Sequence, residues 1–253
     1  MLAGEPRSFV DLHCHTNASF DSLAAPEAVV RAAVARGLTH LAITDHDRIE
    51  GALRARDVAP AGLTVLVGEE IRTADGDLIA IFIERAVPPG MPAVDTIAAV
   101  REQGGLVGIP HPFDRFRGSL GGGTDTASAG GIVAAAGLVD WIETWNARAL
   151  GRANEHAAAF ALDHGLPGVA VSDSHVPLEV AVAYTSLPGD PSDPDRLLAA
   201  LPGAELVTGR ASYVVRLLGP FAKAVQRARG NARVRSAPDD EVAPEQAAER
   251  SGR

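Results

Sequence analysis

Seven short apolar runs, separated by segments with a helical pattern, constrain the fold of this 253-residue chain more than any other feature. The runs are rich in Val, Ile and Leu and cover residues 9–12, 40–44, 63–67, 78–83, 106–109, 138–142 and 169–172. Ala-rich segments with helical periodicity lie between several of them, at 26–37, 94–103 and 152–164. Strands that alternate with helices at this spacing predict an α/β fold with a parallel sheet, open or closed into a barrel.

The length and the composition along the chain predict one domain followed by a tail. Residues 1–230 contain every expected strand and helix and are enough for one large core. Residues 231–253 have charges, Pro, Ala and Gln but no aromatic residue, which predicts a disordered C-terminal tail. The segment 118–131, rich in Gly, Ser and Thr, is predicted to be a loop.

Charge and cysteine content narrow the classes of function. The formal net charge of −9 makes non-specific binding to a nucleic-acid backbone unfavourable, so we expect no nucleic-acid partner. Cys14 is the single cysteine, so no internal disulfide can form and a cytoplasmic location is expected. The N-terminal residues do not resemble a signal peptide, and no apolar stretch is long enough for a membrane span.

Histidine and carboxylate residues follow the apolar runs at their C-terminal ends. His13 and His15 follow the first run, and alternation in an extended segment places both imidazoles on the same side. The other polar groups near run ends are Asp21, Asp45, His46, Asp47, Glu69, Glu70, Asp77, His111, Glu143, Asn146, Asp173 and His175. Because ligands bind at the C-terminal ends of strands in α/β folds, these side chains are expected at one rim.

Imidazoles mixed with carboxylates are the ligands that Zn, Mn and Fe ions accept. Each motif alone also fits a helix cap, a rigid loop or a surface turn, but their recurrence at successive strand ends favours a metal site. The candidate ligands are too many for one tetrahedral ion, which predicts two or three divalent ions. Glu70 is a natural bridge, because the two oxygens of a carboxylate can bind two ions.

In combination and order, these motifs resemble the PHP (polymerase and histidinol phosphatase) domain family of metal-dependent phosphoesterases. The resemblance covers about residues 8 to 220 and is carried by the segments 11–16, 44–47, 68–70, 111–112 and 172–175. It implies a distorted seven-stranded β/α barrel with a di- or trinuclear metal site at the C-terminal rim of the strands.

The resemblance also implies how the ligands divide among the ions. The first ion would take His13, His15, Glu70 and Asp173, and the second would take Asp21, His46 and His175. Glu70, Asp77 and His111 would serve a third ion. Many relatives have histidine where this chain has Asp77, and aspartate is a shorter and harder ligand for the third ion.

The implied activity is hydrolysis of a small phosphomonoester or phosphodiester, nucleotide-like or a sugar phosphate, by a metal-activated hydroxide. Asp45, Asp47 and His175 are candidates for protonating the leaving group. Arg115, Arg117 and Arg148 are candidates for binding phosphate because of their planar guanidinium groups, together with Asn146. The alternatives are an exonuclease that trims oligonucleotides, a metallohydrolase of the amidohydrolase type that cleaves another bond, and a non-catalytic metal-binding module.

Overall fold

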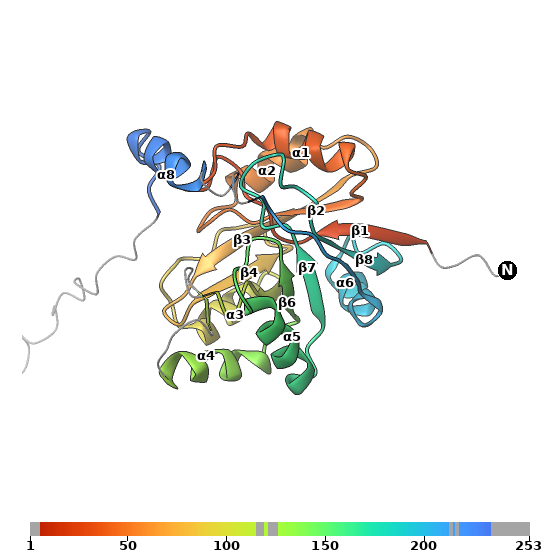
Figure 1. The fold of residues 1–253 in the computed structure, drawn as a ribbon, viewed down its shortest axis with the longest axis vertical. Coiled ribbons are helices and arrows are strands. Elements are labelled where there is room, and N and C mark those ends of the chain that lie inside the picture. The colour runs from red at the N-terminus through yellow and green to blue at the C-terminus, as the bar shows by residue number, and fades with distance from the viewer. Residues whose placement is uncertain (1–5, 115–118, 121–125, 213–214, 216–217, 234–253) are drawn as a thin grey trace, which may run out of the picture.

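The computed structural model describes residues 6–114, 119–120, 126–212, 215 and 218–233. Their strands form one nine-stranded sheet, in the order β7-β6-β5-β4-β3-β2-β1-β8-β9. The strands are β1 (Arg7–Asp11), β2 (His40–Ile43), β3 (Thr64–Arg72), β4 (Asp77–Ile81), β5 (Leu106–Ile109), β6 (Trp141–Asn146), β7 (Gly168–Val171), β8 (Tyr184–Pro188) and β9 (Glu205–Val207). The sheet curves into a barrel that is almost closed (Figure 1), which confirms the distorted α/β barrel.

The helices cover the outside of this barrel. Figure 1 shows α1 and α2 together on one side, α3 to α5 on another, and α6 beside β8. Their bounds are α1 (Pro26–Ala35), α2 (Glu50–Val58), α3 (Ala93–Arg101), α4 (Thr126–Ala136), α5 (Ala153–His164), α6 (Pro194–Ala200), the 3-10 helix η1 (Leu201–Gly203) and α8 (Leu218–Ala228). Helix α4 begins inside the segment predicted to be a loop, so that prediction is wrong from Thr126 onward. No helix of the described residues is long and apolar enough to cross a membrane.

Barrel closure depends on polar contacts between the first strand and the segment after β7. Residue 14 pairs with residue 174 in an isolated parallel bridge, and the His15 amide donates to the Ser174 carbonyl at 2.8 Å. The buried Asp11 carboxylate accepts from the amides of Ser172 at 3.0 Å and Ala181 at 3.1 Å. These contacts bring the ligand-bearing ends of β1 and β7 together.

The direction of β4 differs from the predicted parallel sheet. Strand β4 runs antiparallel to both β3 and β5, and its residues pair with β3 from Gly68↔Ile81 to Arg72↔Asp77. The loop 73–76 joins the two strands and is closed by the Thr73 amide, which donates to the Gly76 carbonyl at 3.0 Å. A loop this short forms a hairpin, whereas parallel strands need a long crossover. The first residues of β4 therefore lie at the rim that holds the C-terminal end of β3.

The sheet has nine strands where seven were predicted. Strand β8 pairs antiparallel with β1, and β9 pairs antiparallel with β8. Neither has the continuous apolar pattern of the other strands: β8 buries the polar Thr185 and Ser186, and all three residues of β9 are exposed. The two strands extend the sheet beyond β1.

Alternation along the strands divides most of the described core into two large hydrophobic clusters. Leu41 and Ile43 of β2 pack in the cluster that includes the helix residues Val29 and Ile97. Ala42, between them, belongs to a second cluster that gathers inward-facing residues of the barrel and includes the fully buried Trp141. Apolar side chains thus fill both the space between the helices and the sheet and the interior of the barrel, and the polar groups lie at the rim.

Gly108 of β5 gives a test of this packing, because a methyl group at this position would overlap the indole ring of Trp141. We predict that Gly108→Ala lowers the free energy of unfolding by about 1–3 kcal/mol, the usual cost of overpacking. Urea denaturation measures this loss. Gly137→Ala is the control, since a methyl group there meets no atom within 4 Å. Equal stability of the two variants would contradict the packing described here.

Candidate metal centre

The predicted ligands converge at one rim of the barrel and form three overlapping groups. One group contains His15, Asp21, His46 and His175; a second contains His13, His15 and Glu70; a third contains His46, Glu70 and Asp77. Within each group, one potential ligand atom of every residue lies within 4.8 Å of the others. The segment after β1, the β2–α2 connection, β3, β4 and the segment after β7 all contribute residues.

The imidazoles of His13 and His15 face each other, as the i, i+2 spacing predicted. Their Nε2 atoms are 3.0 Å apart, and both lie close to Glu70 Oε2, at 3.2 Å for His13 and 3.4 Å for His15. Asp173 Oδ1 is 3.9 Å from His13 Nε2 and 3.6 Å from His15 Nε2. This is the predicted first ligand set, gathered around one point.

Asp21 joins two further histidines on the other side of His15. Its Oδ2 lies 3.3 Å from His46 Nε2 and 3.2 Å from His175 Nε2. Glu70 lies between the groups, with Oε2 3.3 Å from His46 Nδ1 and Oε1 3.1 Å from His111 Nε2. The two oxygens of Glu70 therefore face different histidines, in the arrangement expected of a bridging carboxylate.

The electrostatics of these groups are those of a dense, buried cluster. Burial alone would raise the pKa of Asp21, but His175 and His46 hold it well below its usual range. Burial also acts to lower the pKa of His13, yet the carboxylates of Glu143 and Glu70 raise it to about 10. Burial and the neighbouring His175, His13 and His46 lower the pKa of His15 well below its usual range.

The donor set fits divalent metal ions. All of the clustered groups are buried, and imidazole nitrogens and carboxylate oxygens from five segments point at one another rather than at hydrogen-bond donors of the backbone. Within the described part of the chain, His15 Nδ1 and His46 Nδ1 are buried without a hydrogen-bond partner. Burying so many ionisable groups is unfavourable unless cations compensate their charge, so the residues present fit a multinuclear site.

Asp77 reaches the rim because β4 is antiparallel. As the first residue of β4 it pairs with Arg72, the last residue of β3, close to Glu70 in the same strand. The family resemblance had grouped Asp77 with Glu70 and His111, whereas among the described residues Asp77 clusters with Glu70 and His46. His111 contacts Glu70 and donates to, or accepts from, Ser119 Oγ at 3.1 Å.

A second layer of polar residues positions the ligands, and the sequence interpretation had not assigned its central member. Glu143 Oε1 lies 2.6 Å from His13 Nδ1, and Glu143 Oε2 accepts from the His111 amide and from Asn146 Nδ2, each at 2.8 Å. Asn146 Nδ2 also donates to Asp173 Oδ2 at 2.9 Å. Glu143 lies at a strand end, but its contacts with His13 and with the His111 amide could have been predicted only from the register of the strands.

Three site residues have left-handed backbone conformations that are uncommon outside glycine. The φ angles are 55° for Asp47, 27° for His111 and 51° for Asp173. Such conformations cost free energy and persist where surrounding contacts impose them, which is common at functional sites. The hydrogen bonds of Glu143 with the His111 amide and of Asn146 with Asp173 are contacts of this kind.

The structure gives the three candidate acids different surroundings. Both oxygens of Asp45 accept from Thr16, from its amide and its hydroxyl, each at 2.6 Å. Asp47 Oδ1 accepts from the Arg72 amide at 2.8 Å. Among the described residues lining the central cavity, His175 is the one candidate of the three. Asp45 and Asp47 therefore hold neighbouring segments in place.

The predicted phosphate-binding residues also differ in their surroundings. Arg148 lines the central cavity, while its Nη1 forms an ion pair with Glu179 at 2.7 Å. The Asn146 side-chain amide donates to Glu143 and Asp173, so it positions these carboxylates, and its contact with phosphate stays a prediction. Arg115 and Arg117 lie outside the described residues.

Two cations from the C-terminal region, Lys223 and Arg233, line the same cavity and were missed from the sequence. Lys223 Nζ lies 5.3 Å and Arg233 Cζ 5.6 Å from the centre of the Phe20 ring. Arg233 falls in the segment 231–253 that was predicted to be a disordered tail. Because Arg233 and Asn231 contact the rim, the folded part extends at least to Arg233, and residues 234–253 lie outside the described part.

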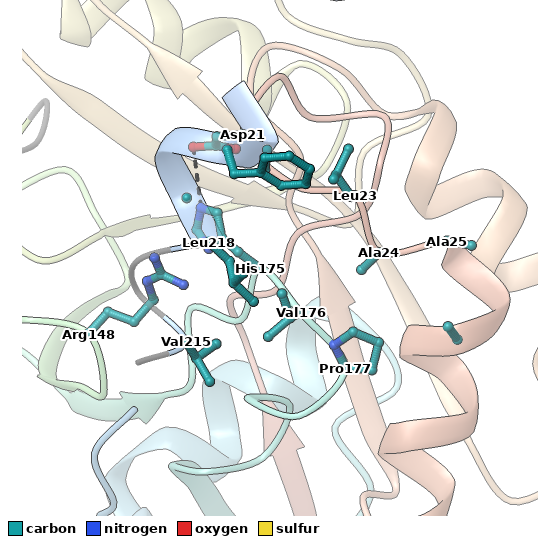
Figure 2. Close-up of a pocket in the computed structure, with 14 residues that line it drawn as sticks. Asp21, Leu23, Ala24, Ala25, Arg148, His175, Val176, Pro177, Val215 and Leu218 are labelled. Carbon is teal, nitrogen blue, oxygen red and sulfur yellow. Dashed lines mark ion pairs between the residues drawn. The ribbon is translucent and has the colours of Figure 1, made fainter. Parts of the chain in front are cut away.

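Two cavities meet at this rim. The central cavity has a volume of about 460 Å³ and includes Glu70, Asp173, His175 and the three cations. The second cavity, of about 340 Å³, is lined mainly by apolar side chains such as Leu23, Val176 and Leu218. Figure 2 shows that Asp21 and His175, joined by their ion pair, form the polar end of the second cavity, with Arg148 beside them.

Comparisons with known proteins agree with this architecture. The PHP domain model matches residues 11–109, and the PHP-associated model matches residues 151–204. An uncharacterised protein of Methanocaldococcus jannaschii is 34% identical over 122 residues, which is 44% of this chain and 71% of that protein. A 5'-3' exoribonuclease of Haemophilus influenzae is 31% identical over 117 residues, which is 41% of this chain and only 42% of the exoribonuclease.

A solved structure from Bacteroides vulgatus shares the fold. It is a two-domain protein containing a predicted PHP-like metal-dependent phosphoesterase, and it superimposes with a TM-score of 0.68 at 20% identity. The similarity covers 82% of this chain and 66% of that chain. This chain belongs to the PHP domain family of metal-dependent phosphoesterases, as the sequence predicted. The exoribonuclease among its relatives removes the support for the expectation that nucleic acid is not a partner.

Glu143 provides a test of the second layer. We predict that Glu143→Gln weakens Mn²⁺ binding roughly 10- to 100-fold, because outer carboxylates orient histidine ligands and make them more basic. Competition with a chelator measures the affinity, and urea denaturation checks that the variant is folded. Glu155→Gln on the exposed side of α5 is the matched control and should bind as the wild type does. An unchanged affinity for Glu143→Gln would show that this carboxylate does not support the ligands.

Proposed function

We propose that this protein hydrolyses a small phosphomonoester or phosphodiester, with a nucleotide-like or partly apolar organic group, at the rim described above. The observation that carries the proposal is the juxtaposition of the buried ligand groups with Arg148, Lys223 and Arg233 in one cavity. A ligand cluster alone would suit many hydrolases. Cations beside it favour a substrate with several negative oxygens, and phosphate esters have these.

We assign the metal-binding role to His13, His15, Asp21, His46, Glu70, Asp173 and His175, with Asp77 and His111 at the edge of the cluster. Mn, Zn or Fe ions suit this donor set. When bound there, divalent ions would supply Lewis-acid activation of water and neutralisation of phosphate charge. Glu143 and Asn146 would hold His13 and Asp173 in their orientations throughout.

Arg148 is the residue that we expect to orient the phosphate group. Its ion pair with the buried Glu179 fixes the guanidinium between the two cavities, so little side-chain entropy remains to be lost on binding. Lys223 and Arg233, provided by the C-terminal region, also line the central cavity. A phosphate between them would have cationic contacts on more than one face.

The apolar cavity beside Asp21 and His175 fits the organic group of the ester. It opens onto the ligand cluster and is lined by Leu23, Ala28, Val176, Leu218 and Phe221, so it offers little to a hydrated sugar and much to a base or an aryl group. Burial of apolar surface there would contribute binding free energy remote from the reacting bond. This favours esters with a flat or apolar leaving group.

We assign protonation of the leaving group to water in the open cavity rather than to a protein acid. His175 belongs to the ligand cluster through Nε2, and its Nδ1 lies 2.9 Å from the Asp173 carbonyl oxygen. Neither nitrogen is then available as a donor to substrate. Asp45 and Asp47 are engaged with Thr16 and Arg72.

Exonucleolytic trimming of short oligonucleotides is the second candidate function. The similarity to an exoribonuclease over 117 residues favours it, and the apolar cavity would also accept a terminal base. The net charge of −9 opposes binding of a long polyanion but not of a few nucleotides at a cationic rim. Relative rates on mononucleotides and short oligonucleotides distinguish the two functions.

A hydrolysis screen with Mn, Zn or Fe over nucleotides, sugar phosphates and model mono- and diesters tests the proposed activity. It detects inorganic phosphate from monoesters, and the released alcohol or monoester from diesters. We predict product release from at least one small ester and complete loss of it in a His13→Ala, Asp173→Ala double variant, because two residues of the predicted first ligand set are removed. The control removes the same residue types from the exposed end of α5, as Asp163→Ala with His164→Ala. Activity that survives in the first variant would mean that the reaction occurs elsewhere.

Arg148 has its own test. We predict that Arg148→Ala raises KM for the ester by roughly 10-fold or more, the effect of losing a hydrogen bond to a charged group. Steady-state kinetics measure KM and kcat separately. Arg152→Ala, at an exposed arginine outside the cavity, is the control and should leave KM unchanged. Equal KM values for wild type and Arg148→Ala would assign Arg148 a structural role.

A further inference from the structure

Arg233, beyond the last helix, places a guanidinium group at the edge of the ligand cluster. Its Nη2 donates to Asp77 Oδ1 at 2.8 Å, and its Nε lies 3.5 Å from Asp47 Oδ2. The Cζ atom lies 5.6 Å from the centre of the Phe20 ring. The side chain is only 25% exposed, so this is a partly buried ion pair rather than a surface contact.

The position of Arg233 is fixed by buried contacts of the same C-terminal region. Gln226, in α8, donates through Nε2 to the carbonyl oxygens of Asn17 at 2.7 Å, Ser19 at 2.9 Å and Ser22 at 2.7 Å. Asn231 Nδ2 donates to the Ala18 carbonyl at 3.0 Å. These bonds attach the C-terminal region to the loop that carries Asp21. The last of them, from Asn231, lies two positions before Arg233 in the sequence.

Arg233 and a metal ion would compete for the same carboxylate. Asp77, His46 and Glu70 form one of the three groups that could hold an ion, and Asp77 Oδ1 is the oxygen that Arg233 binds. An ion bound to Asp77 would place two positive charges next to each other in a partly buried site. The other two groups do not include Asp77 and are free of this competition.

We propose that the guanidinium group of Arg233 takes the place of a third metal ion, so that the protein binds two ions and a fixed protein cation. Arg233 neutralises Asp77 and Asp47 and lines the cavity next to Glu70 and His111. A planar guanidinium can hold a carboxylate and still direct a donor at a phosphate oxygen. The phosphate contact rests on the proposed function, whereas the number of ions does not.

The number of ions tests the proposal without any assay of activity. Metal-free protein is titrated with Mn²⁺ by calorimetry, and bound Mn²⁺ is counted after desalting. We expect two ions per chain for the wild type and for Arg233→Lys, and three for Arg233→Ala and Arg233→Gln, since the cation is then lost. Arg229→Ala, at an exposed arginine of the same region, is the control and should bind two.

A second substitution maps the additional ion. Asp77→Asn combined with Arg233→Gln should return the count to two, because the third group then lacks its carboxylate. Three ions in the wild type, or two in both neutral variants of Arg233 that remain folded by urea denaturation, would overturn the proposal. The same variants separate it from the proposed function: if the wild type hydrolyses no phosphoester but binds two ions, the function fails and the role of Arg233 stands.

Discussion

Concentrating imidazole and carboxylate groups at one buried rim is the constraint on which the rest of the structure depends. Buried ionisable groups are stable only when partners satisfy them. The chain provides these partners in layers: Glu143 beside His13, Asn146 beside Asp173, and Thr16 beside Asp45. Much of the polar sequence at the strand ends therefore serves the ligands without being one of them. The apolar barrel below is the rigid base that keeps these layers in register.

The sequence predicted which side chains meet at the rim better than it predicted the sheet. His13 and His15 were placed correctly because alternation in a strand depends on local geometry alone. The reversal of β4 escaped prediction because its apolar run has no direction, although the Asp75-Gly76 pair is a turn signal. The reversal did not affect the assignment of Asp77 to the site, since the start of an antiparallel strand and the end of its neighbour share one edge. Asp77 therefore lies at the predicted rim although the predicted direction of β4 was wrong.

The roles that the sequence did not reveal depend on tertiary contacts. Glu143 orients His13, which is 130 positions away in the sequence, and no local sequence pattern connects the two residues. Arg233 lies in a segment whose composition is typical of disorder, yet Gln226 and Asn231 attach that segment to the Asp21 loop through backbone carbonyls. Composition reports how much apolar surface a segment can bury, and it does not report a few well-placed hydrogen bonds.

The C-terminal region connects the two cavities with the ligand cluster. Helix α8 supplies Leu218 and Phe221 to the apolar cavity, Lys223 to the central one, and Gly219 to both. Its Gln226 holds the loop from which Asp21 reaches His46 and His175. Because Asp21 is a shared element, the free energy that docks α8 and the free energy that assembles this ligand group are coupled. A change that displaces α8 therefore alters the apolar cavity, the position of Lys223 in the central cavity, and the ligand group that contains Asp21.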